Sequence, residues 1–350
     1  MTQVRVTLKK TLRLAVDPNA IDSRASMASL QQAAELLRSG GTVAFPTETV
    51  YGLGANALDH RAVQSIFEAK KRPAWDPLIV HVVDQEQLAR VAVDIPPNGR
   101  LLMKAYWPGP LTLLLPRNSG VPAIVTAGRD RVGVRMPRHP VAQRLIELAN
   151  VPIAAPSANS FGRTSPTRAE FVLQDLDGRI DAVIDSGVTT LGLESTVVDV
   201  CADPPILYRP GMVTFQQLQS LCPSLTVYRE SPDGLAEAQP APGVGLKHYS
   251  PLARLILSDD ADPGELLSLA AQLHAEGETV GIMSPVAHLE PNLYIIYEWG
   301  GMSDPQRLAQ RLFAGLRELD DAGATVIICP LPKEEGLGIA IRDRLLKAAR

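Results

Sequence analysis

Residues 40–83 combine strand and helix patterns in an order that limits the possible folds more than any other part of the chain. After a Gly-Gly break, the apolar run 42–45 predicts a strand that ends at Pro46. A polar loop follows, residues 60–72 carry apolar side chains at helical spacing, and LIVHVV at 78–83 predicts a second, buried strand. The order strand, loop, helix, strand is typical of an α/β protein.

The rest of the chain continues this alternation in two regions. Apolar periodicity predicts helices near 27–38, 100–106, 140–149 and 167–175, and strands near 111–115, 129–137, 181–185, 194–200 and 206–210. After a Pro- and Gly-rich segment the alternation restarts, as in a small parallel-sheet domain. We therefore predict an N-terminal arm or edge strand (1–26), a first domain (27–217), a linker (218–251) and a smaller Rossmann-like α/β domain (252–350).

The composition excludes several classes of protein. With 350 residues, 45% of them apolar and 21% charged, the chain has the composition of an ordinary globular protein. A net charge of −4 argues against binding nucleic acid through bulk electrostatics, although a local basic groove would not alter the total much. The three cysteines are widely spaced and suggest neither disulfides nor zinc. With no signal peptide or membrane-length apolar run visible, we expect a cytoplasmic protein.

The common nucleotide and hydrolase signatures are missing or weak. The chain has no GxxxxGK[ST], HExxH or GxSxG motif. Gly52, Gly54 and Ala57 fit GxGxxG/A, but the predicted strand ends near Pro46, so these glycines do not join a strand directly to a helix. We instead expect the glycines to form a backbone bend in a loop.

Cations, one histidine and short polar side chains gather near the ends of the predicted elements. Lys70 could simply offset the negative end of a helix dipole, and Arg131 and Arg135, on one face of a strand, could form a solvated edge. Alternatively, these cations clamp an anion. The loop at 151–167 is either a plain connection or a ligand loop after a strand. The candidates are Lys70, Arg72, Arg131, Arg135, Arg209, His81, Thr47, Thr49, Ser157, Asn159, Ser165 and Ser195.

This set contains no nucleophile with an evident activating base. It suits binding of a polyanion beside a small carboxylate-bearing molecule, with the rate gained from positioning and charge neutralisation. The linker adds a basic and aromatic cluster, Lys247, His248 and Tyr249, which could close over such a site.

Six ordered motifs resemble the YrdC-type threonylcarbamoyl-AMP synthases. They are TVAFPTETVYGLG, KKRPAWDPLIVH, VGVRMP, PSANSFGRTSPT, ESTVVD and LYRPG, and the match runs from about residue 27 to 217. The segment PGVGLKHYSP and the region after it resemble the longer, two-domain members. The resemblance implies a YrdC-like twisted open mixed sheet in the first domain, which would be the catalytic domain.

The resemblance also implies a reaction and a set of site residues. L-Threonine, bicarbonate or CO2, and ATP would give L-threonylcarbamoyl-adenylate and pyrophosphate for a downstream tRNA threonylcarbamoyl transferase, with Mg²⁺ bound mainly through the phosphates and no protein metal site. Lys70 and Arg72 would be catalytic. Threonine would contact Thr47, Thr49, His81, Arg135, the backbone of Ala155, and Ser195. ATP would contact Arg72, Asp76, Arg131, Ser157, Asn159, Ser165, Arg209 and, from the linker, Tyr249.

Two other functions fit the same cations. One is a double-stranded RNA or tRNA binding module whose basic groove contacts the phosphate backbone. The other is a related carbamoyl-adenylate chemistry that uses carbamoyl phosphate. The three functions require different substrates, so supplying each substrate separately distinguishes them.

Overall fold

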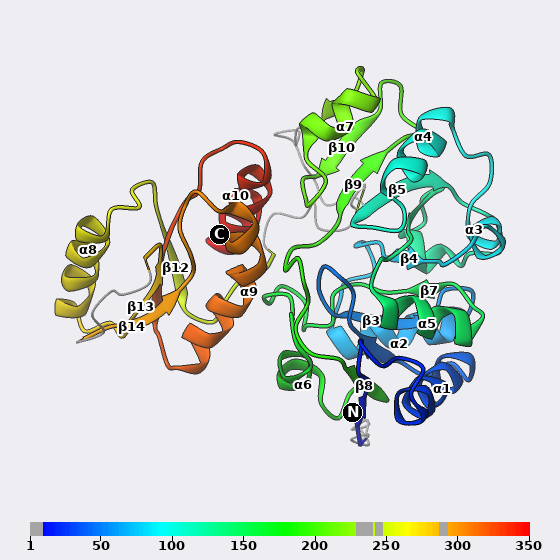
Figure 1. Ribbon diagram of the computed structural model, residues 1–350, viewed down its shortest axis with the longest axis horizontal. Coiled ribbons are helices and arrows are strands. Elements are labelled where there is room, and N and C mark those ends of the chain that lie inside the picture. The colour runs from blue at the N-terminus through cyan, green and yellow to red at the C-terminus, as the bar shows by residue number, and fades with distance from the viewer. Residues whose placement is uncertain (1–9, 229–240, 242–247, 287–292) are drawn as a thin grey trace, which may run out of the picture.

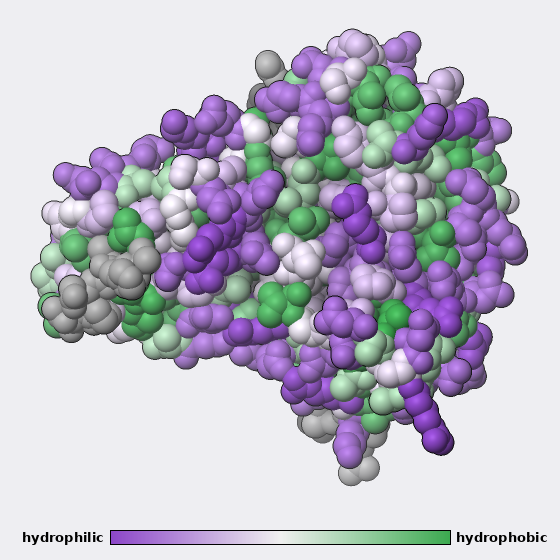
Figure 2. All heavy atoms as spheres, in the orientation of Figure 1, coloured by the Kyte–Doolittle hydropathy of each residue, from purple (hydrophilic) through white to green (hydrophobic). Residues whose placement is uncertain are grey.

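The structure is a computed structural model that describes residues 10–228, 241, 248–286 and 293–350. These residues form two α/β units, one around an eleven-stranded mixed sheet and one around a four-stranded parallel sheet (Figure 1). On the face drawn in Figure 2, hydrophilic side chains dominate and apolar ones lie in small, separate groups. The predicted α/β class, with a large mixed sheet and a smaller parallel sheet, is confirmed.

Parallel and antiparallel pairs alternate irregularly across the large sheet. Its strand order is β1 (Leu12–Ala15), β8 (Ala182–Asp185), β2 (Val43–Phe45), β3 (Gly52–Asn56), β7 (Ile153–Ala154), β4 (Ile79–His81), β6 (Arg131–Arg135), β5 (Leu111–Pro116), β9 (Thr196–Asp199), β10 (Ile206–Arg209) and β11 (Thr226–Val227). β1 lies at one edge, so the predicted N-terminal segment forms an edge strand at 12–15.

Helices cover both faces of this sheet, and each face has its own apolar core. In β2, Val43 and Phe45 pack in the same cluster as α1 and α5, whereas Ala44 points to the opposite face, in the same cluster as α2. The helical segments are α1 (Arg24–Arg38), α2 (His60–Lys70), α3 (Gln85–Val91), α4 (Pro97–Tyr106), η1 (Ala123–Thr126), α5 (Pro140–Ala149), α6 (Ala169–Leu176) and α7 (Phe215–Leu221).

One predicted loop is a strand. Residues Gly52–Asn56 form β3, which runs antiparallel to β2 and pairs Gly54 with Val43. The prediction of a glycine bend here is therefore wrong. A Cβ on Gly54 would lie 2.7 Å from Cε1 of Phe45, so this glycine leaves room for a buried aromatic ring on the neighbouring strand.

The large sheet also extends beyond the predicted boundary at residue 217. The helix α7 begins at a capping box formed by Thr214 and Gln217, and β11 then pairs in parallel with β10. The first domain thus reaches residue 228. Most of the predicted linker, 229–240 and 242–247, lies outside the described residues.

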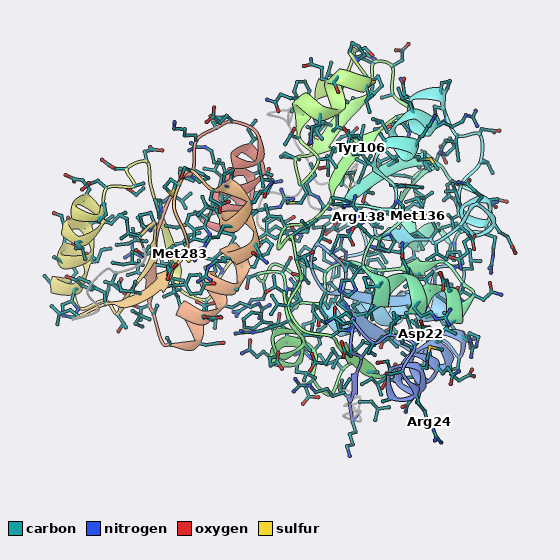
Figure 3. The ribbon with its side chains drawn as sticks, in the orientation of Figure 1. Asp22, Arg24, Tyr106, Met136, Arg138 and Met283 are labelled. Carbon is teal, nitrogen blue, oxygen red and sulfur yellow. The ribbon has the colours of Figure 1, made fainter. Side chains whose placement is uncertain are left out.

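The C-terminal domain has the predicted parallel sheet. Its strands lie in the order β12 (Arg254–Ser258), β15 (Val326–Pro330), β13 (Val280–Ser284) and β14 (Ile295–Glu298), with helices α8 (Pro263–Ala275), α9 (Pro305–Asp321) and α10 (Leu337–Ala348). Helices α9 and α10 face the large domain (Figure 1). Met283, labelled in Figure 3, packs against α9 at Gly315, where a Cβ would lie 2.7 Å from the Met283 Cε.

Candidate active site

A pocket of about 560 Å³, counting its open mouth, brings most of the predicted residues together. It lies where β3, β4, β6 and the loops after β7 and before β9 meet the segment 248–249. Its lining is Thr47, Thr49, Val50, Gly52, Arg72, Pro77, Ile79, His81, Arg135, Ala155, Pro156, Ser157, Glu194, Ser195, Arg209, His248 and Tyr249. Mixed cationic, hydroxyl and apolar groups in one concave site are typical of small-molecule binding.

One side of the pocket is organised around Arg135, the last residue of β6. Its Nη1 donates to Oγ1 of Thr49 at 2.9 Å, and its Nε donates to the carbonyl of Gly109 at 3.2 Å. Thr47 Oγ1 lies 2.8 Å from Thr49 Oγ1 and donates to the carbonyl of Val50 at 2.7 Å, so the two threonines of the PTET loop hold each other. Thr47, Thr49 and Arg135 therefore form one connected hydrogen-bonded group.

The turn at 107–110 supplies part of that arrangement. Arg138 follows β6 and donates from Nε to the carbonyl of Pro108 at 3.1 Å; Met136 and Arg138 are labelled in Figure 3. The backbone N–H of Gly109 donates to the carbonyl of Met136 at 2.8 Å. These contacts fix the turn against the end of β6, which places the Gly109 carbonyl beside Arg135.

Glu48, which was not among the predicted site residues, is the acidic partner of Arg135. Its Oε1 lies 2.7 Å from Arg135 Nη2, and both side chains are buried. Burial alone would raise the pKa of Glu48, but the charge of Arg135 holds it below its usual value. The only sequence signal for this pair was an acid between two threonines in an otherwise apolar stretch.

His81 ends β4 and lies next to Arg135 in the parallel register of β4 and β6. Its side chain is 3% exposed, its ring makes an edge contact with Phe45, and its Nδ1 has no hydrogen-bond partner among the described residues. Burial, aided by the positive charge of Arg135, lowers the pKa of His81 to about 3. The imidazole is therefore neutral at physiological pH. Ala155 lies nearby in the lining, with its N–H donating to the carbonyl of Ile79 at 2.8 Å.

Arg72 and Arg209 supply the positive charge of the other side. The helix α2 ends at Lys70, its C-cap Lys71 has the left-handed conformation, and Arg72 follows directly. Arg72 donates to the carbonyls of Asp76 and Pro77 and pairs with the Asp76 carboxylate at 2.9 Å. Asp76 is thus a buried partner of Arg72 and does not itself line the pocket.

Ser195 holds the side chain of Arg209, the last residue of β10, and also contacts β5. Arg209 Nε donates to the Ser195 carbonyl at 3.0 Å and its Nη2 donates to Ser195 Oγ at 3.2 Å. The same hydroxyl lies 2.8 Å from Thr112 Oγ1 on β5. Ser195 therefore orients a cation of the pocket as well as lining it.

Lys70 is not part of the lining. Its Nζ donates to the Ser157 carbonyl at 2.5 Å and to the Asn159 carbonyl, beneath the loop that follows β7. Burial, together with the charge of Arg72, lowers the pKa of Lys70 well below its usual value. The structure thus makes Lys70 a support for this loop and corrects the prediction that it faces the phosphates.

The loop after β7 contributes unequally to the site. Ser157 lines the pocket, whereas Asn159 is buried below it and donates to the carbonyls of Ser160 and Arg163. Ser165 is also buried and donates to Glu194 Oε1 at 2.5 Å. Only Ser157 of this trio lines the cavity.

Arg131 lies outside the pocket. It shares a strand with Arg135, but at the opposite end of β6, where its half-exposed side chain pairs with Asp199. Four residues of extended chain span roughly 13 Å, so two residues on one strand face need not reach one site. The structure brings only Arg135 to the cavity.

The segment 248–249 closes one wall of the pocket, and the C-terminal domain supports it. Tyr249 is buried, stacks on Phe313 of α9 with ring centroids 5.6 Å apart, and lies 5.4 Å from the guanidinium carbon of Arg344 on α10. His248 makes an edge contact with Phe161 at 5.3 Å, and its Nε2 is 3.7 Å from Asp76, too long for a hydrogen bond. Glu194 and Arg344 were absent from the predicted site, whereas His248 was predicted as part of the linker cluster that could close over it.

No group of three or more potential metal-ligating side chains occurs in the described part of the chain. Likewise, none of its described helices is long and apolar enough to cross a membrane.

The fold and pocket define a two-domain α/β protein whose site suits an anionic ligand beside a smaller polar one. A family model described as "Telomere recombination" matches residues 35–211, and one described as "Threonylcarbamoyl-AMP synthase, C-terminal domain" matches residues 213–350. Threonylcarbamoyl-AMP synthase of Pyrococcus abyssi is 42% identical, with 91% of this chain and 93% of that protein covered. The Bacillus subtilis protein of the same name is 41% identical, with 91% and 92% covered.

A solved structure agrees with these sequence matches. P. abyssi Sua5 complexed with L-threonine has a TM-score of 0.89 and 40% identity, with 97% of this chain and 98% of that chain covered. The chain therefore belongs to the threonylcarbamoyl-AMP synthase family of enzymes, in its two-domain form, and the resemblance drawn from the six motifs is confirmed.

Proposed function

We propose that this chain condenses L-threonine, bicarbonate or CO2, and ATP into L-threonylcarbamoyl-adenylate with release of pyrophosphate. The product would feed threonylcarbamoyladenosine formation in tRNA through a separate transferase. The observation that carries the proposal is one pocket with two differently built sides. We take as the first side the connected group of Arg135, Thr49 and a neutral His81. We take as the second side Arg72 and Arg209, whose charges both act on Tyr249.

The first side suits an amino acid. The Arg135 guanidinium would pair with the threonine carboxylate, although it already shares its charge with Glu48 at 2.7 Å. A neutral His81 leaves the threonine amine free of a second nearby cation and offers a hydrogen-bonding group to the substrate. A relative, P. abyssi Sua5, has been solved in complex with L-threonine, which supports an amino-acid ligand for this family.

The second side suits a nucleotide triphosphate. The threonine amine would lose a proton and attack CO2, and the resulting N-carboxylate would attack the α-phosphorus of ATP while the bond to pyrophosphate breaks. Arg72 and Arg209 would offset the negative charge that develops on the phosphates. Bound Mg²⁺ would supply further charge neutralisation through the phosphate oxygens, and we propose it as a companion of ATP rather than of protein carboxylates.

The test is pyrophosphate release by the full chain, with mass spectrometry of the product formed from labelled threonine and labelled bicarbonate. Release should require both co-substrates, and carbamoyl phosphate should not replace bicarbonate. Arg135→Met should raise KM for threonine at least tenfold, whereas Arg209→Met should mainly raise KM for ATP. Release that persists without threonine would reject the proposal. Salt-sensitive RNA binding that survives Arg72→Ala would instead indicate a separate RNA surface.

A further inference from the structure

Glu194 is an unexpected group in a pocket that is to hold a polyanion. Its side chain is 8% exposed, it lines the cavity, and Arg209 is among the charges that act on it. An uncompensated carboxylate at this place would repel phosphate oxygens strongly, since the surroundings screen charge poorly. Burial alone would raise the pKa of Glu194, but Arg344 and Arg209 hold it below its usual value, so the group is an anion at neutral pH.

The partner that compensates this carboxylate belongs to the other domain. Arg344 Nε donates to Glu194 Oε2 at 2.9 Å, across 150 positions of sequence. The other oxygen, Oε1, accepts from Ser165 Oγ at 2.5 Å. Both carboxylate oxygens thus already accept a hydrogen bond from the protein.

Arg344 is itself held in place by its own helix. It is fully buried on α10, and its Nη1 donates to the adjacent Asp343 carboxylate at 2.6 Å. Lys347, one turn further along α10, pairs with the same Asp343 at 2.9 Å. The guanidinium also faces the ring of Tyr249, which lines the pocket. One side chain of the C-terminal domain therefore contacts two residues of the pocket wall.

We propose that Arg344 is a positioning residue of the nucleotide side of the pocket. It neutralises Glu194 and holds its carboxylate against Ser165, so that the C-terminal domain completes a binding site built on the large domain. The inference rests on the proposed function, because it takes the ligand beside Glu194 to be a nucleoside triphosphate.

A purely structural role, in which Arg344 only joins the domains, makes a different prediction. A second buried interdomain pair serves as the comparison: Arg317 on α9 lies 2.9 Å from Asp175 and also donates to the carbonyl of Thr164. Arg317 is 2% exposed, and neither Arg317 nor Asp175 lines the pocket. Arg317→Met thus removes an interdomain cation of similar burial without baring a carboxylate in the site.

The experiment compares Arg344→Met, Glu194→Gln, the double variant, Arg344→Lys and Arg317→Met in the full chain. KM for ATP should rise about tenfold or more in Arg344→Met, because the bared Glu194 repels the phosphates, while KM for threonine stays within about twofold. In the double variant, Glu194→Gln combined with Arg344→Met should restore KM for ATP to within about threefold of wild type. KM for ATP in Arg344→Lys should lie between wild type and Arg344→Met. Arg317→Met frees the loop carbonyl of Thr164 but bares no carboxylate of the pocket, so it should raise KM for ATP clearly less than Arg344→Met does.

Calorimetry of ATP binding without threonine gives a second readout, and circular dichroism melts check folding. Equal effects of Arg344→Met and Arg317→Met, or no rescue by Glu194→Gln, would overturn the inference. If Arg344→Met does not fold, Glu194→Gln alone decides: ATP should bind as tightly as, or more tightly than, in wild type, and weaker binding by threefold or more would refute the repulsion. A wild type that binds no ATP and forms no product would instead reject the proposed function.

Discussion

Acidification should lower the free energy of unfolding of this protein in part through the buried side chain of His81. His81 is 3% exposed at the end of β4, next to Arg135, and its pKa is lowered to about 3. In the unfolded chain a histidine titrates near pH 6.5. Between these two values the unfolded state binds a proton that the folded state rejects, so the free energy of unfolding falls as the pH drops.

The size of the effect depends on how far the pH lies below the pKa that His81 has in the unfolded chain. From pH 7.5 to pH 5.5, His81 should cost about 1.4 kcal/mol of stability, because one pH unit below 6.5 is worth about 1.36 kcal/mol. The loss starts near pH 6.5 and continues until the folded pKa is reached. Above about pH 8 this residue contributes almost no slope, because the unfolded state has then lost the proton as well.

Urea unfolding at pH 7.5 and pH 5.5 measures this directly. His81→Asn should reduce the stability difference between the two pH values by about 1.4 kcal/mol, whatever its effect on stability at pH 7.5. His139→Asn is the matched comparison: burial also lowers the pKa of His139, but its side chain is only partly buried, so it should remove less. An unchanged pH dependence in His81→Asn would show that His81 is not held neutral in the fold.

Three further predictions concern packing and domain structure. Gly54→Ala should cost about 1–3 kcal/mol, measured as a lowered Tm, because its Cβ would lie 2.7 Å from Phe45, whereas Gly133→Ala, with contacts of 3.4 Å or longer, should cost less. Lys70→Met should lower the Tm and raise KM for ATP, since two buried carbonyls of the pocket loop lose their donor at about 1–3 kcal/mol each. A chain truncated after residue 228 should keep the large sheet, as circular dichroism would show, but should release pyrophosphate poorly; full activity would exclude a role for the segment 248–249.

Local sequence patterns predicted most of the fold because a strand or helix with one buried face carries apolar residues at regular spacing. The strands 111–115 and 181–185 and the helix 140–149 appear almost as expected. β3 was missed because its sequence, GLGAN, carries the glycines of a turn; their reason is the Phe45 ring on the neighbouring strand, which no local pattern reveals. Helix α3 and strand β11 also went unpredicted.

The site residues divide in the same way. Thr49, His81, Arg135 and Arg209 were recognisable because polar groups stood out against apolar surroundings, and the structure gathers them in one pocket. Lys70 stood out equally, but whether a buried amine faces a ligand or a backbone carbonyl depends on the path of a distant loop. Residue type and spacing identify side chains that could take part in binding or catalysis. Whether such a side chain points into the pocket depends on how distant parts of the chain pack around it.

The pair of Glu194 and Arg344 lay beyond local sequence reasoning because its meaning depends on how two domains dock. The docking is close: at Gly192, φ is +75° and a Cβ would lie 2.5 Å from the backbone of Gln310 on α9. The N–H of Gly192 in turn donates to the carbonyl of Thr49 at 3.1 Å. Helix α9 thus packs closely against the loop at Gly192, which is hydrogen-bonded to the threonine side of the pocket. Helix α10 supplies Arg344 to the nucleotide side. A change in docking would therefore reach both sides at once, which is why the contrast between Arg344→Met and Arg317→Met separates local charge from domain position.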